Sequence, residues 1–159
     1  MAIVHVRIDD RLIHGQVATM WINAVGVDRI MVVDDAAAND DVMKMSLKLA
    51  CPNAIALSVL PVERAAERIL AGNYENQRVF LIVKGVDTVK RLVDLHVDLK
   101  TVNVGNLRFE NNRVKIAKTI AVNTIERQMI QELHQRGVQF TAQLTPVDNV
   151  VDLIHLLHE

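Results

Sequence analysis

The residues best suited to chemistry lie in one polar segment near the start of the chain, Arg7 to Gln16, which reads RIDDRLIHGQ. Apolar and polar residues alternate from Ala2 to Ile8, and this pattern predicts a short strand leading into the segment. From Val17 onward apolar residues recur at helical spacing, so a helix is predicted to begin at about Gly15. Open α/β sheets bind ligands in such loops, just outside the carboxyl ends of the strands. We therefore expect the functional site in this strand-to-helix loop.

His14 and Arg11 are the candidate catalytic residues of the loop. His14 is predicted at or next to the N-cap of the helix, where free backbone N–H groups and the positive end of the helix dipole favour an anion such as phosphate. Arg11 lies three residues earlier, and its guanidinium can bind the same anion through two hydrogen bonds. These residue types predict an imidazole nucleophile in an anion-binding loop. The alternative is that His14 is a structural or merely exposed histidine and Arg11 a surface arginine.

Residues around this pair complete the predicted site. The carboxylates of Asp9 and Asp10 either orient the imidazole or the guanidinium, or form surface ion pairs of little energetic value with Arg11. The expected phosphate-binding or supporting residues are Asp9, Asp10, Gly15, Gln16 and Val17.

Two further polar clusters follow predicted strands and are candidate supporting positions. Asp34 and Asp35 end the apolar run 29–33, and they either face the same crevice or act as solvated loop acids and helix caps. Asn103, Gly105 and Asn106 end a later strand, where the glycine allows the backbone to approach a phosphate closely, unless the three form an ordinary turn. At each cluster both alternatives stay open.

Composition and pattern together predict the fold class. Half of the residues are apolar but only 3% are aromatic, a usage that suits an α/β sheet whose strands are buried on both faces. Strands and helices are predicted to alternate about six times, which indicates a three-layer α/β/α architecture: a mostly parallel open sheet of about six to seven strands with helices on both faces. We expect a single domain over residues 1–159, since no repeat, low-complexity segment or interior linker divides the chain.

Three segments carry more specific structural expectations. The helix that ends before Pro52 is predicted to turn Val42, Met45 and Leu49 inward, with Met43 as a further candidate. Residues 113–122 are expected to form an antiparallel excursion or an irregular segment. A final helix is expected to start at Pro146 and to bury an apolar face made of Val147, Val150, Val151, Ile154 and Leu157.

The same composition limits the classes of partner and ligand. A formal net charge of -1 and scarce aromatic residues give no reason to expect nucleic acid as a partner. The chain has no dinucleotide-binding or P-loop motif, and His155 and His158 lack further metal-ligating neighbours, so neither a cofactor nor a metal is predicted. With Cys51 as its single cysteine and no apolar run near the roughly 18 residues of a membrane helix, we expect a soluble, cytoplasmic protein.

The segment from Arg7 to Val17 closely resembles the active-site motif of the EIIB components of the bacterial phosphoenolpyruvate-dependent sugar phosphotransferase system, in its mannose/fructose/sorbose and N-acetylgalactosamine subfamily. Residues 102–105 are similar to that family's Asn-Val-Gly motif, and Gln143 with Pro146 to its C-terminal Gln-x-x-Pro region. Two departures lie outside the nucleophile loop and bear on the partner or substrate subtype: the residues after the second motif, Leu107-Arg108, and the residue before the proline, Thr145.

The resemblance implies a phosphoryl carrier without a cofactor. His14 would accept a phosphoryl group from the phosphorylated EIIA component, with Arg11 helping to hold it, and would pass the group to a sugar imported through the membrane EIIC and EIID subunits. The implied partners are thus EIIA, EIIC, EIID and a sugar, with the membrane reached only through partners and a homodimer left open. The competing hypothesis is a binding module that senses a phosphorylated ligand or protein through the same loop without covalent transfer.

Overall fold

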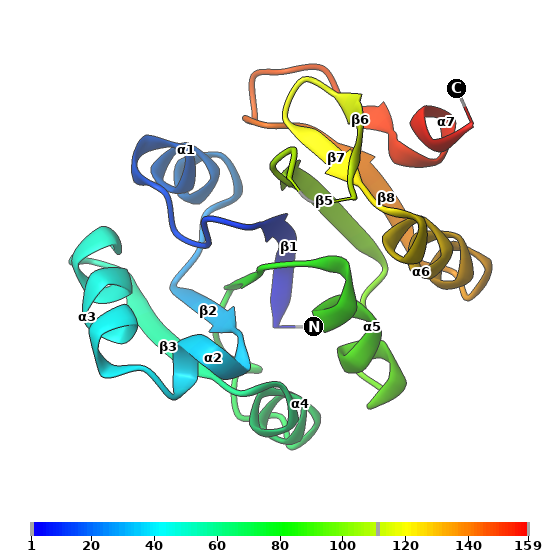
Figure 1. The fold of residues 1–159 in the computed structure, drawn as a ribbon. Coiled ribbons are helices and arrows are strands. Elements are labelled where there is room, and N and C mark those ends of the chain that lie inside the picture. The colour runs from blue at the N-terminus through cyan, green and yellow to red at the C-terminus, as the bar shows by residue number, and fades with distance from the viewer. Residues whose placement is uncertain (1, 111, 159) are drawn as a thin grey trace.

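A seven-stranded sheet forms the centre of the protein in the computed structural model, which describes residues 2–110 and 112–158. Its strands are β1 (Ile3–Asp9), β2 (Arg29–Val33), β3 (Ala56–Leu60), β4 (Val79–Val83), β5 (Thr101–Asn106), β8 (Gln139–Ala142) and β9 (Val151–Asp152). They lie in the order β3-β2-β4-β1-β5-β8-β9 (Figure 1). Neighbouring strands are parallel except for the β8–β9 pair, which is antiparallel. The prediction of a mostly parallel open sheet is confirmed.

Helices cover both faces of this sheet, as the three-layer prediction requires (Figure 1). On one face, α1 (Gly15–Val25) and α3 (Asp41–Ala50) bury Trp21, Ile22 and Leu47 against Phe80 and Ile82 of β4. The other face packs against α4 (Val62–Leu70), α5 (Val86–Asp94), α6 (Thr124–Gln135) and α7 (Leu153–Leu157). A short helix, α2 (Asp35–Ala38), follows β2. Every residue of β4 is buried, because helices cover this central strand from both sides.

Residues 113–122 contain an antiparallel hairpin, so of the two alternatives the antiparallel excursion is confirmed. The hairpin consists of β6 (Val114–Ala117) and β7 (Ile120–Val122). It attaches to the carboxyl end of β5 through Leu107, whose N–H donates to the Thr119 carbonyl at 2.9 Å and whose carbonyl accepts from the Ala121 N–H at 2.8 Å. The excursion therefore lies at the end of the sheet where the predicted site begins.

The prediction of a long final helix from Pro146 is wrong. Residues 143–148 form turns, and the chain then adds β9 to the sheet before the short helix α7. The Asp148 carboxylate accepts hydrogen bonds from the N–H and the hydroxyl of Thr145, both at 2.9 Å. Such local side-chain bonds offer the backbone an alternative to a helix. Val147 and Val150 are consequently exposed.

The predicted inward face of α3 is also wrong, except for Met43. Val42, Met45 and Leu49 are 77%, 60% and 80% exposed, whereas Leu47 is buried and Met43 packs beside it. Both sets of residues are apolar and both recur at helical spacing, so the sequence pattern fits either face. Packing against the sheet selects the Met43–Leu47 face.

His5 of β1 is a partly buried histidine in the core beside α1. Its ring stacks on Trp21 with 4.3 Å between centroids and lies 5.1 Å from the Phe80 ring. Its buried Nε2 has no hydrogen-bond partner among the described residues. Burial, reinforced by the positive charge of Arg7, lowers the pKa of His5 from 6.5 to about 4. The folded protein therefore holds this imidazole neutral.

This histidine predicts a specific loss of stability in mild acid. Between pH 7 and pH 5 the unfolded chain takes up a proton on His5 that the folded chain does not, so the free energy of unfolding should fall by about 2 kcal/mol. Urea denaturation at both pH values measures the change. The variant His5→Leu should lose most of this dependence, and an unchanged pH dependence in that variant would contradict the assignment.

Candidate active site at the carboxyl end of β1

The loop 10–14 carries the chain from β1 into α1 and places His14 at the N-cap of that helix, as predicted. His14 has extended backbone angles, φ -127 and ψ 100, and its side chain makes no capping hydrogen bond. The imidazole is exposed, and the residue lines a small hollow together with Arg7, Asp9 and Val17. An exposed imidazole without hydrogen bonds is accessible to an incoming group.

The backbone of this loop adopts two uncommon conformations. Leu12 is buried with φ 61, in the left-handed region that side-chain-bearing residues rarely adopt, and Gly15 has φ 42. The Leu12 N–H donates to the Asp9 carbonyl at 2.9 Å, which closes a tight turn. A leucine is held in such a conformation only where its surroundings determine it, and residues of this kind cluster at functional sites.

Asp9 fixes the Arg11 side chain. Arg11 donates from Nε to Oδ1 and from Nη2 to Oδ2 of Asp9, both at 3.1 Å, and its backbone N–H donates to Oδ1 at 3.0 Å. This two-point contact holds the guanidinium plane at the mouth of the loop, where 27% of the Arg11 side chain stays exposed. The expectation that an aspartate orients the guanidinium is met by Asp9.

Arg7 lies beneath this pair as a second, buried cation. Its Nη2 donates to Asp9 Oδ2 at 3.1 Å and its Nη1 donates to Asn103 Oδ1 at 2.7 Å, while the Asn103 amide donates to the Gln143 carbonyl at 2.9 Å. The residue is 2% exposed. Burial lowers the pKa of Arg7 from its ordinary value, and the neighbouring Asp9 carboxylate opposes this effect. One buried network thus ties β1, β5 and the end of β8 together under the loop.

Gly105 makes room for the Arg7 guanidinium. A Cβ atom built on Gly105 would lie 2.1 Å from Arg7 Cζ, so only glycine fits beside the charged group in this arrangement. From the sequence, Gly105 is expected either to permit a close backbone approach to phosphate or to form a turn. In the structure, this glycine accommodates an arginine from the neighbouring strand.

Asp10 points away from Arg11 and binds the segment after β5. Its carboxylate accepts from Asn106 Nδ2 at 2.6 Å, from the Arg108 N–H at 2.9 Å and from Arg108 Nε at 3.1 Å. Although burial opposes the effect, these bonds hold the pKa of Asp10 below its ordinary value. Arg108, one of the two departing residues after the second motif, therefore anchors the loop 10–14 to the segment that follows β5.

Asp34 and Asp35 bind backbone N–H groups at the starts of two helices, and Asp35 also binds an arginine. Strand β4 lies between β2 and β1, so the carboxyl end of β2 is not directly beside that of β1. Asp34 caps α2 by accepting from the Ala37 N–H at 2.9 Å, and Asp35 accepts from the Val62 N–H at 2.9 Å and from Arg91 at 2.8 Å. The bonds to the Ala37 and Val62 N–H groups agree with the alternative in which these aspartates act as helix caps. The Arg91 and Val62 bonds lower the pKa of Asp35.

No role in the site was predicted for Arg7 or for the Gln143 carbonyl, and Asn106 was expected beside the phosphate or in a turn rather than as a partner of Asp10. A signal for Arg7 was present, because a charged residue in a strand predicted to be buried on both faces requires a partner. The partner itself, Asn103, sits directly opposite Arg7 in the β1–β5 register. That register depends on the strand order, which a single sequence does not specify.

These groups can bind and transfer an anion without a metal ligand set. In the described part of the chain, no group of three or more His, Cys, Asp or Glu side chains is placed to hold a metal ion. What the loop offers is an exposed imidazole, the first backbone N–H groups of α1 and a guanidinium held in a fixed plane. This set suits a phosphoryl group with its several negative oxygens.

Comparison with known proteins decides the family. The family model for the PTS system sorbose subfamily IIB component matches residues 3–159. The chain belongs to this family. It is 34% identical over 157 residues to the fructose-specific EIIB component of Bacillus subtilis, covering 99% of this chain and 96% of that protein. The IIB domain of the Klebsiella pneumoniae sorbose permease superimposes with a TM-score of 0.95 at 28% identity, over 99% of this chain and 97% of that one.

A third relative of this EIIB-family chain is about twice as long as the chain itself. The mannose-specific EIIAB component of Escherichia coli is 32% identical over 157 residues, which is 99% of this chain but only 49% of the relative. The resemblance inferred from the Arg7–Val17 motif is thus confirmed over the whole described fold, and the chain is an EIIB-type component of the sugar phosphotransferase system. Within the described residues, no helix is both long enough and apolar enough to span a membrane.

Proposed function

We propose that this EIIB-family chain is a phosphoryl carrier that acts through His14. The imidazole accepts a phosphoryl group from phosphorylated EIIA and passes it to a sugar imported through the membrane EIIC and EIID subunits. The observation that carries the proposal is the exposed, unbonded imidazole of His14 at the N-cap of α1, beside the Arg11 guanidinium that Asp9 fixes. The family match supports the same role.

Transfer from the donor moves phosphorus between two nitrogens. The N–P bond of a phosphohistidine on EIIA breaks while an unprotonated nitrogen of His14 forms a new N–P bond, and the donor imidazole is released. The backbone N–H groups at the start of α1 and the Arg11 guanidinium stabilise the charge on the three equatorial oxygens of the transition state. The reaction needs no metal, and transfer between like bonds runs readily in either direction.

The buried network keeps these donors in place before the phosphoryl group arrives. Asp9 joins two arginines, so these three residues together carry a net charge of +1. Because Arg11 is held at two points and also through its backbone N–H, little reorganisation is required during transfer. Asp10 and Arg108 hold the other side of the loop.

The partners follow from the same proposal. We assign the whole chain, residues 1–159, to one EIIB-type phosphotransfer domain in the cytoplasm that meets the membrane only through EIIC and EIID. The relative named as a mannose-specific EIIAB component supports an EIIA partner, since this chain matches about half of that protein. Both partners must reach His14, so the loop 10–14 and the start of α1 form a shared docking face.

The variant His14→Asn tests the proposal. Wild-type protein incubated with phosphoenolpyruvate, the general phosphocarriers and a matching EIIA should gain the mass of one acid-labile phosphoryl group, and His14→Asn should gain none. Intact-mass spectrometry measures both. His96→Asn is the matched control, because His96 has φ 72 and asparagine tolerates this left-handed conformation. An unmodified wild type with a competent donor would favour the binding-module hypothesis.

A further inference from the structure

Strand β3 forms an open edge of the main sheet. It pairs with β2 on one side in the register Arg29↔Ala56 to Val33↔Leu60, and it is the terminal strand of the sheet among the described residues. The Ala56 N–H and the Leu60 carbonyl are bonded on the β2 side. Because backbone groups alternate in direction along a strand, Leu57 and Val59 present their N–H and carbonyl groups at the open edge.

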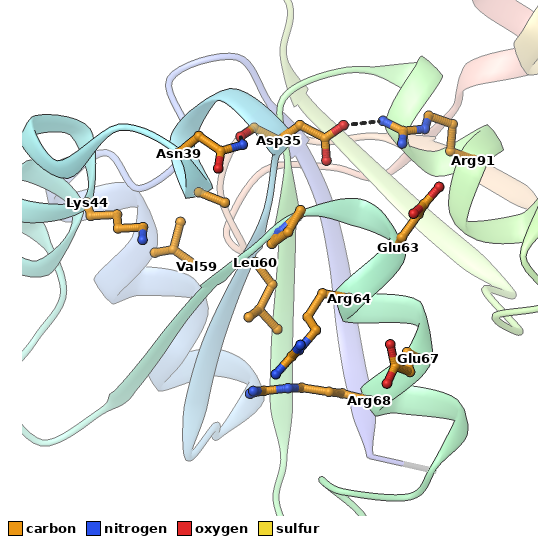
Figure 2. A pocket seen from close by; sticks show the side chains of 12 residues that line it. Asp35, Asn39, Lys44, Val59, Leu60, Glu63, Arg64, Glu67, Arg68 and Arg91 are labelled. Atoms are coloured by element: carbon orange, nitrogen blue, oxygen red, sulfur yellow. Dashed lines mark hydrogen bonds and ion pairs between the residues drawn. The ribbon is translucent and has the colours of Figure 1, made fainter.

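A groove runs along this open edge. One cavity of about 770 Å³ lies at the carboxyl end of β3, between α3 and α4, and Figure 2 shows its lining. A second cavity of about 430 Å³ continues along β3 beside α3, from Val59 back to Ile55. The two cavities share the lining residues Lys44 and Val59, so they are adjacent along β3. We call the two together, lined by residues 55–60 of the strand and by α3 and α4, the β3 groove.

Unpaired cations line both sides of the β3 groove. Lys44 and Lys48 come from α3, and Arg64 and Arg68 come from α4. Within residues 2–110 and 112–158, none of these four is in an ion pair. Figure 2 shows Arg64 and Arg68 extending from α4 in the same direction, although like charges one helical turn apart repel each other.

Acidic residues offset these cations only in part. Glu63 and Glu67 also line the larger cavity, while Arg91 and Asp35 pair with each other at 2.8 Å. With that pair cancelling, four positive and two negative charges remain, a net charge of +2 along the groove. The two faces of β3 also differ in polarity. Ile55, Leu57 and Val59 make the face of the strand towards α3 apolar.

We infer that the β3 groove binds an acidic extended segment of a partner protein, which adds to the sheet as a further strand. The backbone of the segment pairs with Leu57 and Val59, which is how peptides are recognised at sheet edges. Side chains of a strand alternate between its faces. Acidic residues at every second position would then face Arg64 and Arg68, and apolar residues between them would pack beside Leu57 and Val59.

A second copy of this chain fits the groove poorly. Pairing of two β3 strands would bring together two grooves that each carry a net charge of +2, so the two copies would repel each other. The groove is also separate from the His14 loop, since β2 and β4 lie between β3 and β1. The inference is therefore independent of the proposed phosphoryl transfer, and either can fail without the other.

The experiment uses a heptapeptide of alternating glutamate and valine, blocked at both ends, added to the full-length protein at low salt. Amide NMR spectra give the dissociation constant and the exchange rates of individual N–H groups. We expect the exchange of the Leu57 and Val59 amides to slow at least tenfold on saturation. The double variant Arg64→Gln/Arg68→Gln should bind at least fivefold more weakly. The matched control Lys115→Gln/Lys118→Gln removes two exposed cations of the β6–β7 hairpin and should bind within twofold of wild type.

Several results would overturn the inference. A peptide with lysine in place of glutamate that binds equally well would exclude recognition of acidic side chains, and an N-methylated peptide that binds equally well would exclude backbone pairing. Slow exchange of the Leu57 amide without peptide, together with a concentration-dependent dimer in sedimentation, would identify a second copy as the occupant. Binding to phosphatidylglycerol vesicles without peptide-dependent protection would identify a lipid surface.

Discussion

Replacing Gly105 by alanine is expected to destabilise the protein by about 3 kcal/mol, although it adds a single methyl group. The new Cβ would overlap the Arg7 guanidinium, which lies 2.1 Å from its position. That guanidinium has no free space, because Asn103 and Asp9 bind it and the residue is 2% exposed. Urea denaturation followed by circular dichroism measures the loss.

Gly85→Ala is the matched control for this change. A Cβ on Gly85 meets the Asp87 carboxylate at 2.8 Å, but Asp87 is an exposed side chain that is free to turn away. Because that carboxylate can move and the extended backbone of Gly85 suits alanine as well, this variant should cost about 1 kcal/mol. A Gly105→Ala loss no larger than that of Gly85→Ala would show that Arg7 is not confined by the glycine.

Asp9→Asn should be the most damaging single change in the site, with a loss of about 3–5 kcal/mol in the free energy of unfolding. The substitution leaves the buried Arg7 cation without a countercharge and removes the acceptor that holds Arg11 in its plane. Phosphoryl acceptance should fall even under conditions where the variant stays folded, because Arg11 is no longer positioned. Denaturation and the rate of acceptance from phosphorylated EIIA measure the two effects separately.

Asp10→Asn provides the control for charge loss in the same loop. Its main partner, Arg108, has a side chain that is 56% exposed, so water can solvate the cation that is left unpaired, and the loss should be about 1 kcal/mol. A double-mutant cycle of Asp9→Asn with Arg7→Met adds a second check. Losses that add within about 0.5 kcal/mol would contradict direct coupling between the two buried groups.

The active-site loop is the part of the structure that the sequence predicts best. Its strand, N-cap histidine and following helix all lie within one short run of residues, and each follows from local pattern and helix-end chemistry. The alternation of strands and helices likewise suffices for the parallel, three-layer architecture. Asp9 as the partner of Arg11 was predictable because the two lie only two positions apart and a turn brings them together.

Features that depend on distant neighbours were not predictable in this way. The Arg7–Asn103 bond joins residues 96 positions apart, and it forms only because β1 lies beside β5. The burial of the Met43–Leu47 face of α3, rather than of Val42 and Leu49, depends on how the helix meets the sheet. At the C-terminus, hydrogen bonds between Thr145 and Asp148 compete with a helix that the apolar pattern alone favours.

The identity of the phosphorylated residue is the most direct measurement for the proposed function. Wild-type protein is phosphorylated by phospho-EIIA, digested at alkaline pH to preserve phosphohistidine, and sequenced by tandem mass spectrometry. We predict one phosphoryl group, located on His14. Its location on another histidine, or the absence of any phosphohistidine with a donor shown to be competent, would contradict the assignment; the other histidines are His5, His96, His134, His155 and His158.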